Sequence, residues 1–154
     1  MMPSNNIYEA LRESHELQRS LCRKLLRAAP HSERRQEIYQ ELKIELAAHA
    51  AAEERFLYAP ILMDDRGLDP SRHALSEHHE IDELVEGLGK AETQGGSWLA
   101  KAKKLSGEVR HHLREEEKKF FQVSGKILSE AQKEQLARKY LKDYQRMKKK
   151  LAQH

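Results

Sequence analysis

The chain contains a single cysteine, Cys22, among its 154 residues. One thiol cannot form an intrachain disulfide, and it cannot supply the several thiolates of a structural zinc or iron–sulfur site. Any bound metal must therefore be held by nitrogen and oxygen atoms. We expect Cys22 to be a small residue of the core.

Long apolar runs are also missing. No stretch approaches the ~18 apolar residues that mark a membrane-spanning helix. The first residues, Met1 to Asn6, have neither the basic region nor the apolar region of a secretion signal. We therefore expect a cytoplasmic protein with no membrane partner.

Aromatic residues make up only 6% of the chain, and there are seven glycines and four prolines, whereas charged residues reach 34%. This balance suits amphipathic helices better than a turn-rich β fold. The length fits one domain with its own core, over residues 1–154. The predicted fold is all-α: an up-down antiparallel four-helix bundle of two repeated helical hairpins, followed by a fifth helix.

Caps and apolar spacing predict where the first two helices lie. Asn6 caps the first helix, which runs to about Ala28. The second helix opens at Ser32 and continues through Leu57, and we expect Pro60 to end it.

The third helix is predicted to begin at Asp69, as the cap, with Pro70 in the first helical position. Gly87 and Gly89 are expected to weaken it before a break at Gly95 and Gly96.

The fourth helix carries the clearest apolar stripe, from Trp98 to Phe120. The fifth begins at Ser129, with Gln132 as its capping-box partner. We expect the bundle over about residues 7–122 and the last helix over about 129–151.

Basic residues crowd the last predicted helix. We expect this cluster to be a solvated helix face, with nucleic acid an unlikely partner and a homodimer or an acidic partner as the alternatives. Its members are Arg138, Lys139, Lys142, Arg146, Lys148, Lys149 and Lys150.

Histidine is the unusual residue of this chain, and four of its nine copies repeat in register. His15 and His49 are 34 residues apart, and so are His78 and His112. An offset of 63 residues relates the two halves. At this offset, each repeated histidine or glutamate corresponds to a residue of the same type, and apolar residues correspond to apolar residues. It relates His15 to His78, His49 to His112, Glu53 to Glu116, Cys22 to Val85, and Leu42 to Leu105.

Two His-x-x-x-Glu pairs occupy equivalent places in the two halves, and residues four apart share one helix face. Four imidazoles and two carboxylates could hold a pair of first-row ions such as iron, with water or a small molecule completing the coordination. Burying them together without a metal would be costly. The candidate metal ligands are His15, His49, Glu53, His78, His112 and Glu116.

The other histidines are expected to be solvated. Neighbours such as His78 and His79 point about 100° apart on a helix, so only one of each pair can face inward. His73 carries an alternative, because it could approach the site as an additional ligand or as a partner of one. The histidines predicted to be exposed are His31, His73, His79, His111 and His154.

The histidine segments resemble the hemerythrin-like family, known for its HHE cation-binding domain. The matching segments include SEHHEIDEL around His78 and HHLREEEKKFF around His112. The resemblance implies an up-down bundle with two iron ions in a carboxylate-bridged centre, joined by oxo or hydroxo, that reacts with dioxygen, hydrogen peroxide or nitric oxide.

The chain departs from the oxygen-carrying members of that family. They place an aspartate where this chain has Glu117 and a fifth histidine where it has Ala74. We therefore expect Glu116 to be the ligand, and we expect redox reactivity or sensing rather than oxygen storage.

The leading functional hypothesis is a non-haem di-iron protein that binds, senses or reduces a small oxidant. The alternative is a non-catalytic module that responds to iron or oxygen, or an iron donor or store, and the sequence leaves open whether the protein is an enzyme. Four inward imidazoles also predict that the metal-free bundle is sensitive to acid near the reference histidine pKa of ~6.5.

Overall fold

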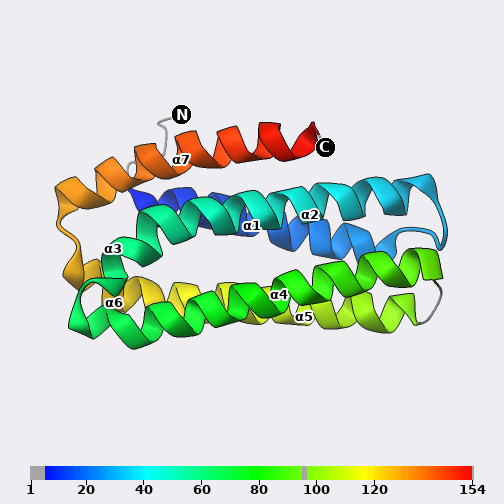
Figure 1. Ribbon diagram of the computed structural model, residues 1–154, viewed down its shortest axis with the longest axis horizontal. Helices are drawn as coiled ribbons and strands as arrows, with labels where there is room; N and C mark the ends of the chain where they lie inside the picture. Colours follow the sequence, from blue (N-terminus) through cyan, green and yellow to red (C-terminus); the bar gives the residue numbers. More distant parts are fainter. Residues whose placement is uncertain (1–5, 95–96, 154) are drawn as a thin grey trace.

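The computed structural model of the protein describes residues 6–94 and 97–153, and the regular structure in these ranges is entirely helical (Figure 1). Four long helices form two antiparallel hairpins, and a fifth packs against the first hairpin. The predicted all-α class, bundle and terminal helix are confirmed. The long elements are α1 (Ile7–Arg27), α2 (Glu33–Glu53), α4 (Leu68–Gln94), α5 (Trp98–Glu115) and α7 (Glu130–Ala152).

Side-chain caps fix three helix starts as predicted. The Asn6 side chain accepts a hydrogen bond in the first turn of α1, and Ser32 does the same for α2. Ser129 and Gln132 form a complete capping box at the start of α7. Each cap satisfies backbone N–H groups that have no partner inside the helix.

The prediction that Pro60 ends the second helix is wrong, because the helical segment continues past this residue. α2 passes into a π-helix, η1 (Glu54–Tyr58), and then into α3 (Ala59–Leu62). Pro60 occupies one of the first two positions of α3. Proline is tolerated at the start of a helical segment, where its missing N–H costs no hydrogen bond.

The first helical residue of the third helix lies two positions earlier than predicted. A 3-10 turn, η2 (Asp65–Gly67), leads directly into α4, which starts at Leu68. Asp69 therefore lies in the first helical turn rather than capping it. Its carboxylate is still well placed there, because the first turn of a helix favours negative charge.

Glycines do not interrupt α4, which continues through Gly87 and Gly89. Gly89 has a packing role, because a Cβ atom there would lie 2.6 Å from the Tyr39 hydroxyl. That hydroxyl donates to the Val85 carbonyl at 2.8 Å, so the glycine gives Tyr39 its place against α4. The predicted break at Gly95 and Gly96 lies outside the described residues.

The fourth predicted helix also contains a π-helix. α5 leads into η3 (Glu116–Phe120) and then α6 (Phe121–Ile127), so the helical segment extends past the predicted end of the bundle. Each π-helix begins at or just after one of the candidate glutamates, Glu53 and Glu116. Such wide turns occur often at functional sites.

Two apolar clusters fill the bundle on either side of the candidate ligands. Cys22 lies in the second of them and is 1% exposed, so its predicted place in the core is confirmed. The first cluster includes Ile7, Leu11, Leu57, Ile61, Phe120 and Phe121, and the second includes Leu21, Leu25, Leu42, Leu88, Leu105 and Leu113.

The basic residues of the predicted cluster on α7 face outward, as predicted, except that Lys148 is half-buried. Its Nζ lies 3.3 Å from Oε1 of the buried Glu45. Among the described residues, no helix combines the length and the apolar character needed to cross a bilayer.

Candidate metal centre

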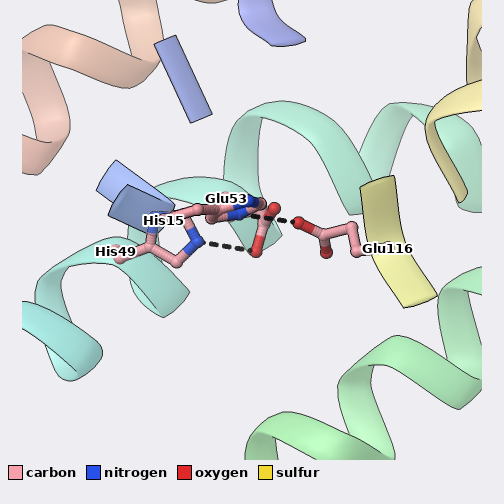
Figure 2. A group of neighbouring side chains, drawn as sticks. All are labelled: His15, His49, Glu53 and Glu116. Carbon is pink, nitrogen blue, oxygen red and sulfur yellow. Dashed lines mark ion pairs between the residues drawn. The ribbon is translucent and has the colours of Figure 1, made fainter. Parts of the chain in front are cut away.

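The structure brings all six candidate ligands together in one buried layer. They form two groups whose donor atoms lie within 4.8 Å of one another, and each group contains both Glu53 and Glu116. Figure 2 shows the first group, with His15 from α1 and His49 from α2 beside the two carboxylates. The second group adds His78 from α4 and His112 from α5.

The Nε2 atom of every imidazole faces a carboxylate of this layer. The four side chains are at most 6% exposed, so the cluster is almost sealed from solvent. The distances are 3.1 Å from His15 to Glu116, 3.2 Å from His49 to Glu53, 3.3 Å from His78 to Glu53 and 3.6 Å from His112 to Glu116.

The opposite ring nitrogen of each histidine is held by a partner outside the layer. His15 Nδ1 lies 2.7 Å from Glu117, and His78 Nδ1 lies 2.8 Å from Glu54. Glu54 and Glu117 are themselves 63 residues apart. The offset that relates the ligands therefore also relates these two anchors, and in each case the anchor comes from the other hairpin.

The remaining two histidines are anchored differently. His112 Nδ1 lies 2.8 Å from Glu77. The residue 63 positions before Glu77 is Ser14, whose side chain is shorter. The Tyr140 hydroxyl from α7 lies between Ser14 and His49, at 2.8 Å from the Ser14 hydroxyl and 2.7 Å from His49 Nδ1, and so connects the two.

These anchors determine which nitrogen carries the proton in a neutral ring. A carboxylate only accepts, so Nδ1 of His15, His78 and His112 must donate, which leaves Nε2 with a free lone pair. His49 reaches the same state when the Tyr140 hydroxyl donates to Ser14 and accepts from Nδ1. All four lone pairs then point into the layer.

Replacing Tyr140 with phenylalanine is expected to weaken metal binding by ~10- to 100-fold, because it removes the partner that orients His49. A calorimetric titration of the metal-free chain with ferrous ion under anaerobic conditions measures the change. Tyr144→Phe is the matched control. It lies one turn further along α7 and removes a hydroxyl that is bonded to Glu45 rather than to a candidate ligand histidine. Equal weakening by both variants would contradict the orienting role of Tyr140.

Several polar atoms in the layer have no hydrogen-bond partner within the described residues. They are His15 Nε2, His49 Nε2, Glu53 Oε2 and Glu116 Oε1, and all are buried. Buried polar atoms normally find a partner, because leaving one unpaired costs about 1–3 kcal/mol. Nitrogen lone pairs and carboxylate oxygens that converge without partners fit a metal centre, and iron accepts such mixed donors.

Burial and mutual charge shift the pKa values of the layer strongly. Burial lowers the pKa of His15 and His78, but their bonds to carboxylates outweigh it and raise these pKa values to about 9 and about 10. Burial raises the pKa of both carboxyls. The charge of His49 reverses this for Glu53, whose pKa lies well below its usual value, whereas the charge of Glu53 adds to it for Glu116.

A metal-free centre would therefore keep His15 and His78 protonated at neutral pH. The expectation that the inward imidazoles gain charge near pH 6.5 is wrong for these two. Their neighbouring carboxylates compensate the charge that burial alone would penalise.

Sequence reasoning missed Tyr58, which lies in the wide turn η1 and is 1% exposed. Its hydroxyl has one proton and lies within hydrogen-bond distance of both Glu53, at 3.0 Å, and Glu116, and it lies 3.3 Å from His78 Nε2. The residue 63 positions later is Phe121, which stacks on His15. The offset could have located this pair, and it shows that one half of the layer has a hydroxyl where the other has none.

The histidines predicted to be solvated are exposed, with His154 outside the described residues. His73 stays outside the layer and contacts Glu77, the anchor of His112, at 3.4 Å. A cavity of about 270 Å³ is lined by His73, His112 and Glu116, so it lies beside two of the candidate ligands.

Comparisons with known proteins agree with this architecture. Residues 6–123 match the family described as "Hemerythrin HHE cation binding domain". A comparison with curated protein sequences returned no match.

Among solved structures, the fold is similar to a hemerythrin HHE cation binding domain-containing protein from Mycobacterium kansasii. The TM-score is 0.84 at 23% sequence identity, over 94% of this chain and 88% of that one. That likeness concerns the fold. Because the family match spans most of the sequence, including every candidate ligand, the chain belongs to the hemerythrin HHE cation-binding domain family.

Proposed function

We propose that the chain is a non-haem di-iron protein that binds or reduces a small oxidant, namely dioxygen, hydrogen peroxide or nitric oxide. One observation carries the proposal: the two ligand groups share both buried carboxylates, Glu53 and Glu116. Two ions bridged by these carboxylates use every donor in the layer. His15 and His49 would hold one ion, and His78 and His112 the other.

The number of donors supports a reactive centre rather than a purely structural one. Each ion would have two imidazoles and an oxygen from each shared carboxylate, which is fewer than the six donors of an octahedral ion. The open positions are available to water or to a small molecule. The cavity of about 270 Å³ that reaches His112 and Glu116 supports access by such a molecule.

When bound, the two irons supply electron exchange with the oxidant, and the chain supplies the surroundings. The Nδ1 anchors hold the imidazoles in place, so little reorganisation is needed when charge changes at the centre. The apolar clusters on both sides keep bulk water away from the layer.

Tyr58 provides a hydrogen-bond donor at one side of the layer. Burial, together with the charges of Glu116 and Glu53, raises the pKa of its hydroxyl well above 10, so the hydroxyl stays protonated. Because Oη lies within hydrogen-bond distance of both shared carboxylates, its one proton can be directed toward the space between them.

The test is to load the full chain with ferrous ion without oxygen and then to mix it with dioxygen, hydrogen peroxide or nitric oxide. We expect two irons per chain by metal analysis and a change in near-ultraviolet charge-transfer absorption with at least one reagent. Freshly purified protein that holds only zinc or no metal, or a ferrous form inert to all three reagents, would overturn the proposal.

A further inference from the structure

A second set of histidine and glutamate side chains lies on the outer face of α4 and α5, outside the buried layer. It consists of two more His-x-x-x-Glu pairs, His73 with Glu77 and His111 with Glu115. Both histidines are exposed, while the side chains of Glu77 and Glu115 are only 11% and 23% exposed. The two carboxylates are therefore held against the protein with the imidazoles above them.

Three donors of this set, from His73, Glu77 and Glu115, converge on one point of the surface, and His111 Nε2 lies beside the two carboxylates. His73 Nε2 lies 3.0 Å from Glu115 and 3.4 Å from Glu77, and His111 Nε2 lies 2.9 Å and 3.6 Å from the same two carboxylates. Donor atoms of His73, Glu77 and Glu115 all lie within 4.8 Å of one another. In the described part of the chain, the ion-pair partners of these two glutamates are all histidines.

An ordinary surface pair on the same helix looks different. His79 and Glu83, also four residues apart, lie 2.8 Å from each other and are both strongly exposed, at 73% and 67%. Their ion pair involves one carboxylate and one imidazole. The outer set instead brings two carboxylates and two imidazoles from two helices to one place, which a single helical pair cannot do.

The outer set also faces a cavity. The cavity of about 270 Å³ is lined by His73, Glu77 and Glu115 at the surface and by His112 and Glu116 deeper in the bundle. Glu77 connects the outer set with the buried layer. Its Oε1 lies 2.8 Å from His112 Nδ1, while its Oε2 faces His73 and His111. One oxygen of Glu77 is thus already fixed, and the other is directed outward.

We propose that His73, Glu77 and Glu115, with His111 as a fourth donor, form an accessory site for one divalent first-row cation such as Zn²⁺. Two imidazoles and two carboxylates match the donor preference and the coordination number of zinc. Calcium and magnesium prefer oxygen donors alone. The bound cation would replace the imidazole–carboxylate contacts and sit at the mouth of the cavity, separate from the buried layer.

The test is a calorimetric titration of the full chain with Zn²⁺, comparing the wild type with the double variant His73→Ala, Glu115→Gln. We expect the variant to bind one zinc equivalent fewer than the wild type. The measured quantity is this difference, so it does not depend on which ion fills the buried layer. In the described residues, neither variant side chain forms an ion pair with any of the six buried candidate ligands, and circular dichroism checks that the helices persist.

The matched control is the double variant His79→Ala, Glu83→Gln, which removes the isolated pair from the same helix and should bind as much zinc as the wild type. An equal zinc count for the wild type and the His73 variant would overturn the proposal. So would an equal loss from the His79 variant, since the binding would then follow any exposed histidine pair.

Discussion

Glu53→Ala and Glu116→Ala are each expected to lose most of the metal that the wild-type chain carries. Each carboxylate belongs to both candidate groups, so one substitution would remove a donor from both of the proposed ions. It also leaves the buried imidazoles that face it without a counter-charge. Metal analysis of freshly purified variants measures the loss.

His79→Ala is the control for these two variants, because its side chain is 73% exposed and contacts only Glu83 among ion-pair partners in the described residues. It should retain the wild-type metal content. Wild-type metal content in Glu53→Ala or Glu116→Ala, with the helices intact by circular dichroism, would show that the shared carboxylates are not ligands.

The stability of the metal-free form and the extra stabilisation that metal provides should change with pH in opposite directions. In the metal-free form, His15 and His78 have pKa values of about 9 and about 10, above the value of ~6.5 in an unfolded chain. Their contribution to stability is complete below pH 6.5 and is lost as the pH rises through 9 to 10. The melting temperature of the metal-free chain should therefore fall between pH 6.5 and pH 10.

One pKa unit corresponds to about 1.4 kcal/mol, which shifts the melting temperature of a chain of this size by ~3–5 °C, so the fall should be at least that large. Metal binding requires neutral imidazoles and releases protons, so the stabilisation by metal should grow over the same range. Thermal melts followed by circular dichroism at several pH values, with and without metal, measure both trends. A metal-free form that becomes more stable toward pH 10 would contradict the raised pKa values.

Much of the centre could be predicted from the sequence because its residues obey two regular spacings. The helical repeat puts His49 and Glu53 on one face, and the 63-residue offset repeats that pair as His112 and Glu116. The structure brings these residues together with His15 and His78. The anchors Glu54 and Glu117 follow the same offset and could have been found with it.

Other features carried no comparable signal. Tyr140 lies on α7, outside the repeated segment, so no internal comparison could relate it to His49. The sequence contains no signal that we could use to predict the two π-helices, and without them Pro60 predicts the end of the second helix. Tertiary packing decided these points, as it often does against local preference.

The unequal anchoring of His49 and His112 has a consequence for protein design. The hairpin of α4, α5 and η3 contains an anchor for both of its histidines. Glu77 holds His112 within the hairpin, and Glu117 of a second copy could hold His78 as Glu54 does here. Two identical copies of this hairpin, related by a true twofold axis, would contain a full set of ligands and anchors. Two copies of the first hairpin would not, because Ser14 cannot replace Tyr140. A minimal symmetric homodimer built from this chain should therefore start from its second half.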